Sequence, residues 1–339
     1  DSLHKENALE NILKRTRQRS VGYSRILKYA AVLLLPLLLG GTLFYVLTFK
    51  QQAGEVLPVS EPKQILPGGP KAILYLSDGQ VIDLNRIVDS VIVDKYSGQE
   101  IALSKDINAL NYSGVTGDIG QSKELAYNRI EVPRGGEYML VLSDGTKVWL
   151  NSETCLEYPL AFGEHSREVR LSGEAYFEVT KDEARCFNVI MEGATIEVMG
   201  TSFNASCYPG EGQCWAVLES GKINLRTDHG VAAVNVGECA SYDIASGKVT
   251  VETVDLKYFT SWRYGTFYFY NTPLSEIVQK LGRWYDVHFK FADESLRDVC
   301  FSGAALRSKP IDFMLELLSS TQSLKFDIQS DGMIMIYKK

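Results

Sequence analysis

The sequence predicts a single-pass membrane protein in which an all-β, sandwich-like domain is followed by a small α+β domain of order β-α-β-β-α-β-β. Three observations predict this fold class. An uncharged run of 21 residues lies near the N-terminus, a series of short alternating segments fills the middle, and the pattern changes after about residue 262. With 339 residues the chain is long enough for two or more domains with ample cores.

Residues 29–49, YAAVLLLPLLLGGTLFYVLTF, carry no charge and predict a transmembrane helix. At a rise of about 1.5 Å per residue this run spans about 31 Å, which matches a bilayer core of about 30 Å. A signal peptide is the competing interpretation. However, the run exceeds the usual apolar region of a signal peptide, and no A-x-A-like cleavage site follows it.

Charge is distributed unevenly along the chain. Residues 1–28 hold seven Lys or Arg against three Asp or Glu, a balance of +4, which leaves −11 for residues 29–339 out of a net charge of −7. The positive-inside rule therefore places the N-terminus in the cytoplasm and the bulk of the chain on the far side of the membrane. The acidic remainder argues against direct binding of nucleic acid, which needs a basic surface.

The region after the membrane segment begins with a linker and contains both copies of an internal repeat. Residues 50–70 are rich in Pro and Gly and predict a linker. LPGGPKAILYLSDGQVIDLN (66–85) then aligns without gaps on VPRGGEYMLVLSDGTKVWLN (132–151). Each copy predicts a β-hairpin, because alternating apolar residues approach an Asp-Gly pair whose glycine can supply the positive φ of a tight turn. The shared Pro and Gly favour duplication of one unit, with chance reuse of a good turn as the alternative.

These patterns divide the remainder of the chain into three parts. Residues 71–127 are interpreted as a scaffold region that contains the first hairpin. Residues 128–260 form short alternating segments separated by Gly, Asn, Asp or Pro, which predict an all-β domain. In the segment AYFEV we expect Ala175, Phe177 and Val179 to face the core, and Tyr176 and Glu178 to face outward.

Residues 262–338 predict the α+β domain. Strands are expected at FYFY, VHFKF, VCFSG, LKFDIQ and MIMIY, with a helix after the first strand and another after the third. The apolar residues that share one helix face are Leu274, Ile277, Val278 and Leu281 in the first helix, and Ile311, Met314, Leu315 and Leu318 in the second.

Enzymatic signals are weak in this sequence. There is no H-E-x-x-H, no G-x-S-x-G, no P-loop and no G-x-G-x-x-G after a strand. We therefore expect no enzyme activity beyond the self-cleavage considered below, no cofactor and no metal. Glu174 and Glu178 lie on the same strand face as Tyr176, and a solvated strand face is favoured over a catalytic pair of carboxylates.

The six cysteines, at 155, 186, 207, 214, 239 and 300, contain no C-x-x-C, so neither a zinc site nor a thioredoxin-like motif is expected. In SCYPGEGQCW the four-residue loop PGEG places Cys207 opposite Cys214 on neighbouring antiparallel strands. Directly opposed residues lie within disulfide reach. A disulfide between them and two free buried thiols both remain open.

The run YFTSWRYGTFYFY (258–270) is dense in aromatic residues. It could form a sugar-binding platform or a partner surface. The favoured interpretation is a core strand together with a packed junction between domains.

Several stretches carry a resemblance to a known family. They are VPRGGEYMLVLSDGTKVWLNSET (132–154), REVRLSGEAYFEVTKDE (167–183), EVMGTSFNAS (197–206), LESGKINL (218–225) and, in the closing domain, FYFYNTPLSEIVQKLGRWYDVHFKFAD and FSGAALRSKPIDFMLELL. Over about residues 28–338 the chain resembles a FecR-type anti-sigma factor of Gram-negative cell-surface signalling. Its last domain is similar to the short N-terminal signalling domain of secretins and TonB-dependent transducers.

The resemblance implies a location and two partners. The protein would lie in the inner membrane, with a cytoplasmic N-terminus and its bulk in the periplasm. Its periplasmic part would sense the signalling domain of a TonB-dependent outer-membrane transducer, and its cytoplasmic part would hold or release an extracytoplasmic-function sigma factor. Because family members carry a larger cytoplasmic segment, residues 1–28 are interpreted as part of a truncated anti-sigma region. The alternative function is a periplasmic glycan-binding or scaffold protein anchored in the inner membrane.

Two site expectations accompany the resemblance. The strand Met333, Ile334, Met335, Ile336 and Tyr337 is a candidate edge strand that extends a sheet of the transducer, or else it is already paired within its own sheet.

The second site is the Gly200–Thr201 step, which matches the position at which some family members cleave themselves. There the Thr201 hydroxyl attacks the Gly200 carbonyl, the peptide C–N bond breaks to release the Thr201 amine, and water hydrolyses the resulting ester. The alternative is that Gly200 permits a bulge and Thr201 favours the next strand.

Overall fold

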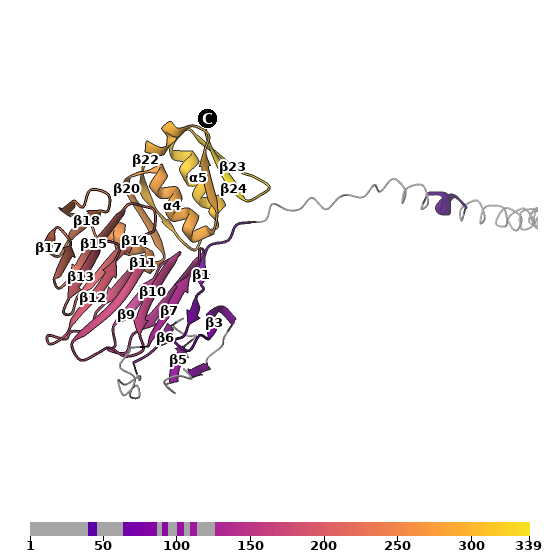
Figure 1. Ribbon diagram of the computed structural model, residues 1–339. Helices are drawn as coiled ribbons and strands as arrows, with labels where there is room; N and C mark the ends of the chain where they lie inside the picture. The colour runs from indigo at the N-terminus through magenta and orange to yellow at the C-terminus, as the bar shows by residue number, and fades with distance from the viewer. Residues whose placement is uncertain (1–39, 46–63, 87–89, 94–99, 105–108, 114–125) are drawn as a thin grey trace, which may run out of the picture. The chain divides into compact units, whose positions relative to one another are not determined.

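The computed structural model of the chain describes residues 40–45, 64–86, 90–93, 100–104, 109–113 and 126–339 (Figure 1). The chain divides into two units, residues 1–63 and 64–339, and every element named below belongs to the second. Residues 40–45 of the predicted transmembrane segment are helical, and the rest of that segment lies outside the described residues. Within the described ranges no helix is both long enough and apolar enough to cross a membrane. The crossing at 29–49 stays a prediction.

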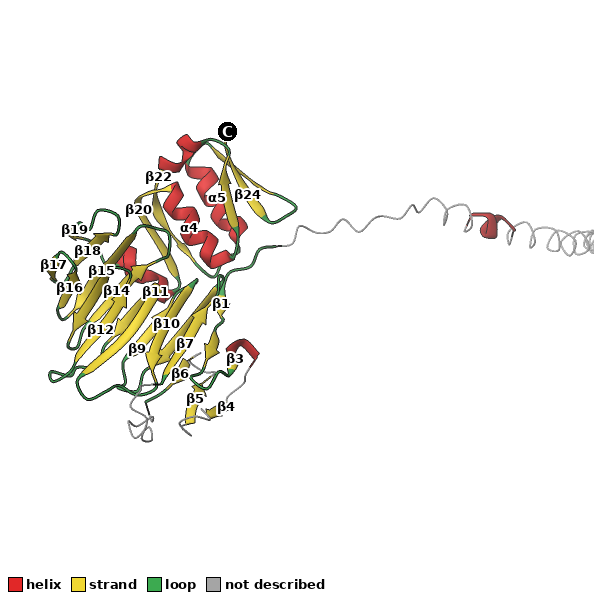
Figure 2. Ribbon diagram, in the orientation of Figure 1, coloured by secondary structure: helices red, strands yellow, loops and turns green. Residues whose placement is uncertain are grey.

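Strands dominate the first part of the second unit (Figure 2). In the described part of the chain, hydrogen bonds connect 19 strands, in two series that share strand β11 (Ser166–Glu178). In spatial order the first series is β3 (Val81–Asp83), β2 (Ile73–Tyr75), β7 (Tyr127–Val132), β10 (Thr154–Pro159), β11, β12 (Cys186–Met191), β13 (Ala194–Val198), β16 (Ile223–Thr227) and β17 (Gly230–Val234).

The second series also runs through β11. In spatial order it is β4 (Ser90–Val93), β5 (Glu100–Ser104), β6 (Ala109–Asn111), β8 (Gly136–Val141), β9 (Lys147–Leu150), β11, β14 (Ser202–Cys207), β15 (Gln213–Ser220), β18 (Glu238–Asp243) and β19 (Val249–Thr253). The short strand β1 (Gly69–Pro70) adds to β8 in parallel.

Strand β11 passes from one series to the other at Gly173. Ser172 pairs with Cys155 of β10, whereas Gly173 pairs with Cys207 of β14. The φ of Gly173 is +113°, and a Cβ there would lie 2.5 Å from the hydroxyl oxygen of Thr154. Only glycine both adopts this positive φ and leaves room for Thr154. This explains why the alternating pattern of β11 is interrupted by a glycine.

The two series enclose one hydrophobic core. Phe177, on the second-series part of β11, packs edge-on against Phe187 of β12 in the first series, with ring centroids 6.2 Å apart. Leu74 and Leu140, from the two copies of the repeat, are both fully buried in this core. The expectation of a mostly β chain with few helices is confirmed. We call the part of the chain that contains strands β1 to β19 the β domain.

Both copies of the LSDG repeat form the predicted hairpin, β2–β3 in the first series and β8–β9 in the second. The turn glycines Gly79 and Gly145 have φ values of +86° and +83°. The amide of Leu76 donates to the carbonyl of Gln80 at 2.9 Å, and the amide of Leu142 donates to that of Thr146 at 2.8 Å. The repeat therefore encodes one turn geometry twice.

The C-terminal domain has the predicted order of elements and its own core. Its elements are β20 (Thr266–Pro273), α4 (Leu274–Tyr285), β21 (His288–Phe291), the 3₁₀ helix η3 (Glu294–Asp298), β22 (Cys300–Leu306), α5 (Ile311–Thr321), β23 (Leu324–Ile328) and β24 (Met333–Lys338). The predicted apolar faces of both helices are buried in that core. Within the described part of residues 64–339, three short helices lie outside that core: η1 (Leu84–Arg86), α3 (Lys257–Thr260) and η2 (Ser261–Tyr264).

The expectation that residues 333–337 form an edge strand is wrong. Strand β24 lies in the centre of a three-stranded sheet, parallel to β21 and antiparallel to β23. Ile334 and Ile336 are fully buried, so Met333, Met335 and Tyr337 alternate with them on the other face. The backbone groups of this strand are already used, because a strand with a neighbour on each side has no free edge.

Candidate functional site: the junction between the β domain and the C-terminal domain

The outer face of the second series is covered, not solvated as the sequence suggested. Glu174 and Tyr176 of β11 are buried, and so is Asn204 of β14. The covering elements are α3 and η2, whose residues belong to the aromatic run 258–270. The ring of Phe259 packs edge-on against Trp215 with centroids 5.2 Å apart. The aromatic run therefore forms a packed junction between the domains, which was the favoured interpretation.

Four arginines hold this junction together: Arg134, Arg263, Arg283 and Arg307. We call them the junction arginines. Each has a side chain no more than 25% exposed. Partly buried guanidinium groups need paired charges and hydrogen bonds to offset the loss of hydration. Their partners therefore show how the two domains are joined.

Arg263 joins η2 to the outer face of the second series. Its guanidinium lies 3.6 Å from the ring centroid of Tyr176, in a cation–π contact. The same group donates to the carboxylate of Glu178 at 2.9 Å. The hydroxyl of Tyr176 donates to Glu219. Burial is the main cause that raises the pKa of Tyr176, so the phenol stays protonated and able to donate.

Arg307 follows β22 and touches both domains. Its guanidinium stacks on Trp284 of α4 at 3.7 Å and donates to the carbonyl oxygen of Trp262 at 2.8 Å. From the β domain it meets the side-chain oxygen of Asn151 at 3.1 Å and the carboxylate of Glu137 at 3.4 Å. Burial lowers the pKa of Arg307, and the nearby carboxylates oppose that change.

Asn151 is oriented toward Arg307 by a buried carboxylate. The Asn151 amide nitrogen donates to one oxygen of Glu174, and the Asn204 amide donates to the other, both at 2.8 Å. This leaves the Asn151 oxygen facing Arg307. With both oxygens occupied by amide donors, Glu174 serves as an acceptor in a fixed network, not as one member of a pair of catalytic carboxylates.

Arg134 and Gly135 cap the C-terminal end of α4 from the other domain. The Arg134 guanidinium donates to the carbonyl oxygens of Gly282 at 2.6 Å and Val287 at 2.8 Å. The amide of Gly135 donates to the carbonyl of Arg283 at 2.7 Å. The last carbonyls of a helix lack partners within the helix, and a cation is favourable at that end. The β domain therefore completes a helix of the C-terminal domain.

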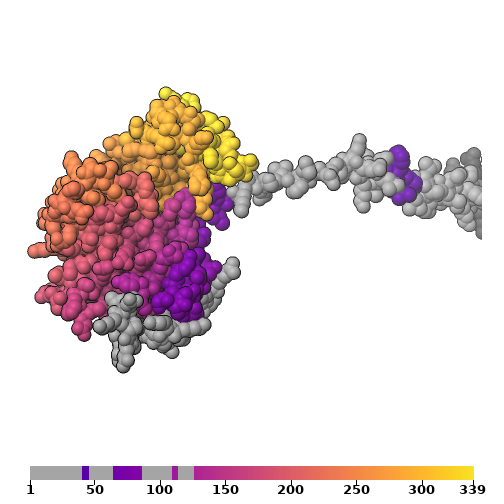
Figure 3. All heavy atoms as spheres, in the orientation of Figure 1, coloured from indigo at the N-terminus to yellow at the C-terminus, as the bar shows by residue number. Residues whose placement is uncertain are grey.

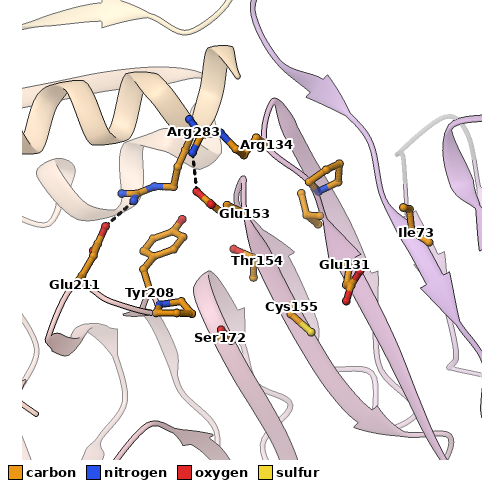
Figure 4. A pocket seen from close by; sticks show the side chains of 13 residues that line it. Ile73, Glu131, Arg134, Glu153, Thr154, Cys155, Ser172, Tyr208, Glu211 and Arg283 are labelled. Atoms are coloured by element: carbon orange, nitrogen blue, oxygen red, sulfur yellow. Dashed lines mark hydrogen bonds and ion pairs between the residues drawn. The ribbon is translucent and has the colours of Figure 1, made fainter. Parts of the chain in front are cut away.

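A pocket of about 340 Å³ lies beside this cap (Figure 4). Its walls are Ile73, Glu131, Val132, Pro133, Arg134, Glu153, Thr154, Cys155, Ser172, Tyr208, Pro209, Glu211 and Arg283. Figure 4 shows Arg283 reaching from α4 to Glu211, a contact of 2.6 Å. Arg134 pairs with Glu153 in the same way, and Glu131 pairs with Arg129 outside the pocket wall.

The pocket offers little for nucleophilic or metal chemistry. Burial is the main cause that raises the pKa of the Cys155 thiol to about 11, so the thiolate, which is the nucleophile, is scarce at neutral pH. Among the residues that the structure describes, no group of three or more His, Cys, Asp or Glu side chains could hold a metal ion.

Cys207 and Cys214 are buried, and the structure joins them in a disulfide. The bond closes the loop that carries Tyr208 and Glu211. Arg283 lies over the Tyr208 ring at 3.9 Å and pairs with Glu211. The disulfide therefore fixes the base of a loop that contributes to the junction.

The structure gives Thr201 a local role. Its hydroxyl lies 3.0 Å from the carbonyl oxygen of Lys222, to which it donates. A Cβ on Gly200 would lie 2.7 Å from the backbone of Lys181, so a close chain contact requires glycine there. Both features favour the structural alternative for this step, and its cleavage stays a prediction.

Comparisons with known proteins agree with this architecture. Residues 128–224 match the family described as FecR protein, and residues 266–335 match the family described as FecR, C-terminal. Two crystal structures of a protein from Parabacteroides distasonis ATCC 8503, assigned to the anti-sigma factors, are similar to this chain. They have 26% and 27% identity and a TM-score of 0.58, and cover 62% and 63% of this chain and 99% of their own. No curated protein matches the chain.

These matches identify the class of protein. The first match lies within the β domain and the second within the α+β domain, in the order that the structure shows. Together with the similarity to the anti-sigma factor structures, these matches support a FecR-type anti-sigma factor.

Sequence reasoning did not identify the junction arginines. Arg134 is separated from Gly282 by 148 positions, and Arg307 from Asn151 by 156. No local pattern connects residues so far apart. The one available signal was the aromatic run itself, because an arginine inside it, Arg263, is well placed for cation–π contacts.

Proposed function

We propose that the chain is the transmembrane regulator of a cell-surface signalling system. Its β domain and C-terminal domain lie in the periplasm and respond to the signalling domain of a TonB-dependent outer-membrane transducer. Its N-terminal segment lies in the cytoplasm and controls an extracytoplasmic-function sigma factor. The family matches support the sigma-factor partner, and the basic residues before an uncharged run support the topology.

The observation that carries the proposal is the junction. A regulator of this kind has to pass a change in the domain that meets the transducer to the rest of the chain. The β domain caps helix α4 of the C-terminal domain, and Arg307 of the C-terminal domain is held by Asn151 and Glu137 of the β domain. The domains contribute groups to each other's structure, so a change in one alters the other.

The sigma-factor partner is tested by affinity purification of the full gene product from its native host. We expect one extracytoplasmic-function sigma factor among the co-purified proteins, identified by mass spectrometry. Deletion of residues 1–28 should remove the sigma factor and leave the β domain folded. Absence of any sigma factor from the wild-type preparation would contradict the proposal.

The transducer partner is tested with the purified signalling domain of a TonB-dependent transducer encoded beside this chain. We expect saturable binding to residues 64–339 by calorimetry. Because β24 is internal, the unpaired edges of the C-terminal domain lie elsewhere, for example at β23. The amide of Gln329 donates inward to Met333, so the amide of the preceding residue, Ile328, faces the open side of β23, and an Ile328→Pro change tests whether binding uses that edge. No binding to the wild type would remove the transducer from the proposal.

Topology is tested with reporters fused after Lys339. An alkaline phosphatase fusion should be active and a cytoplasmic reporter inactive, since the C-terminus is proposed to be periplasmic. The opposite pattern would reverse the assignment.

Self-cleavage between Gly200 and Thr201 is tested on protein from fresh membranes. Cleavage predicts two fragments that separate near residue 200, and Thr201→Ala should then restore one band. The structural alternative predicts a single band for both proteins. The Thr201 hydroxyl already donates a hydrogen bond to the Lys222 carbonyl, which favours the single band.

The glycan-binding alternative finds little support in the part of the aromatic run that meets the β domain, although Tyr264 and Tyr270 of the same run are each 69% exposed. Trp262 is buried in the junction, and the cavity that the aromatic run shares with Glu174 and Arg307 measures about 40 Å³, room for a water molecule. Glycan-array binding by the wild type would reinstate this alternative.

A further inference from the structure

Residues 64–70 were predicted as the end of a linker, yet they contact both domains. We call this segment the strap. It leads from residues 1–63 into strand β1, and Figure 3 shows its violet atoms where the yellow C-terminal domain meets the magenta β domain. Three successive contacts define its path.

The strap first docks on the start of α5. The amide of Ile311 donates to the carbonyl oxygen of Ile65 at 3.2 Å. The Ile65 side chain packs against the core of the C-terminal domain, whereas its neighbour Leu66 is 63% exposed. One of the two adjacent apolar residues therefore anchors the strap and the other does not. The amide of Ile311 is among those at a helix start that have no partner within the helix.

The strap next passes against Trp284. A Cβ built on Gly68 would lie 2.7 Å from both the indole ring and the carbonyl oxygen of Trp284. The φ of Gly68 is not in the left-handed region, so glycine is needed here for space alone. At Gly69 an added Cβ would have nothing within 4 Å. Trp284 is the residue on which Arg307 stacks.

The strap finally joins the β domain. The amide of Gly69 donates to the carbonyl of Gly135 at 3.1 Å, and Pro70 pairs with Glu137 of β8. Glu137 is the carboxylate that meets Arg307. The strap therefore contacts Trp284 at one end of the Arg307 network and Glu137 at the other.

We propose that the C-terminal domain carries a binding site for an extended peptide and that the strap occupies it. The site consists of the first turn of α5 and the face of Trp284. When the strap occupies this site, it links the C-terminal domain directly to the chain that leads to residues 1–63. This link does not run through the β domain. The consequence of docking, signalling across the membrane, rests on the proposed function. The docking of the strap on the C-terminal domain is independent of that function.

The adjacent glycines provide a matched test of docking. Gly68→Ala introduces a methyl group against Trp284, and Gly69→Ala introduces the same group into open space. Hydrogen exchange of the purified full-length chain is followed at two amides, Gly69 and Ile311. In Gly68→Ala we expect exchange at both to accelerate on the order of tenfold or more, because overpacking of this size loosens a local contact. Gly69→Ala should exchange as the wild type does.

A second matched pair removes the anchor instead of blocking the site. Ile65→Asp should accelerate exchange at the Ile311 amide, whereas Leu66→Asp should leave it unchanged. Exchange in β11 and β14 should stay at wild-type rates in all four variants, which shows that the β domain remains folded. Unchanged exchange at Ile311 in both Gly68→Ala and Ile65→Asp would overturn the docking.

The consequence for signalling is measured separately. The amount of sigma factor that co-purifies with Gly68→Ala should change relative to wild type, and the amount with Gly69→Ala should not. A released strap with unchanged sigma factor would overturn the coupling. If the proposed function is wrong, the wild type itself co-purifies with no sigma factor. In that case the hydrogen-exchange rates at Gly69 and Ile311 still test whether the strap docks.

Discussion

The two LSDG hairpins have the same local structure and different surroundings. In both copies the turn glycine has a positive φ, and the leucine two residues before the start of the turn is fully buried. The first hairpin, β2–β3, lies in the first series of strands, and the second, β8–β9, lies in the second series. The repeat fixes the hairpin, while its polar positions are free to acquire separate roles.

The differences lie at those polar positions. Asp78 accepts from the amide of Gln80 within its own turn at 2.9 Å. Asp144 makes the matching bond to Thr146, and in addition pairs at 2.9 Å with Arg167, whose side chain is 0% exposed.

The asparagine that closes each copy differs in the same way. Asn85 accepts from the amide of Ala72 at the base of its own hairpin. Asn151 instead joins Glu174 to Arg307 of the other domain. The second hairpin has become part of the junction, and the first hairpin, β2–β3, has kept the local arrangement.

The largest contrast is expected at the turn aspartates. Asp144→Ala leaves Arg167 buried without its charge partner, which typically costs about 3–5 kcal/mol of unfolding free energy. Asp78→Ala, at a half-buried position, removes the acceptor of hydrogen bonds from the Gln80 amide and side chain and should cost less, about 1–2 kcal/mol. Chemical denaturation of the two variants measures both costs. Equal losses would show that the Arg167 pair adds nothing to the second copy.

A smaller contrast is expected at the asparagines. Asn151→Ala removes one donor from buried Glu174 and one acceptor from Arg307, at a cost of about 1–3 kcal/mol for groups left unsatisfied. Asn85→Ala removes one partly exposed bond and should cost about 0.5–1.5 kcal/mol. Thermal denaturation compares the two. A greater loss from Asn85→Ala would contradict the division of roles between the copies.

The sequence predicted features that depend on local spacing. The two hairpins follow from alternation and an Asp-Gly turn, and the buried faces of α4 and α5 follow from helical periodicity. It could not predict the neighbours of an outward-facing residue. Glu174 points away from the core, as alternation requires, but a segment some 85 positions later covers it.

The errors share one physical cause. A strand pattern specifies which side chains face the same way, but not which strands lie on either side. MIMIY has the alternation of any half-buried strand, and its position at the end of the chain suggested an edge. Pairing on both sides depends on where β21 and β23 lie, which no local pattern contains.

The smallest expected effect is a pH dependence of stability, compared at Lys71 and Glu137, which are aligned positions in the two copies of the repeat. Burial, opposed by Arg307, raises the pKa of Glu137 above its ordinary value of 4.5. The folded state therefore binds this proton more readily than the unfolded state does, and the contribution of Glu137 to stability falls as pH rises from 4.5 through the raised pKa. Wild type should lose stability relative to Glu137→Gln over that range.

The matched control for this pH effect is Lys71→Gln, at an exposed position. It should show no such change relative to wild type between pH 4.5 and neutrality. Denaturation curves collected across the range compare the three proteins. A pH-independent difference between wild type and Glu137→Gln would show that the pKa of Glu137 is the same in both states.

The claim that the second hairpin, and not the first, joins the two domains is tested most directly by a pair of double-mutant cycles. One cycle combines Asn151→Ala with Arg307→Lys, and the other combines Asn85→Ala with the same Arg307→Lys. The account predicts a coupling energy of about 0.5–3 kcal/mol for Asn151 with Arg307, which are in contact at 3.1 Å, and additivity within about 0.5 kcal/mol for Asn85. Additive losses in both cycles would contradict it.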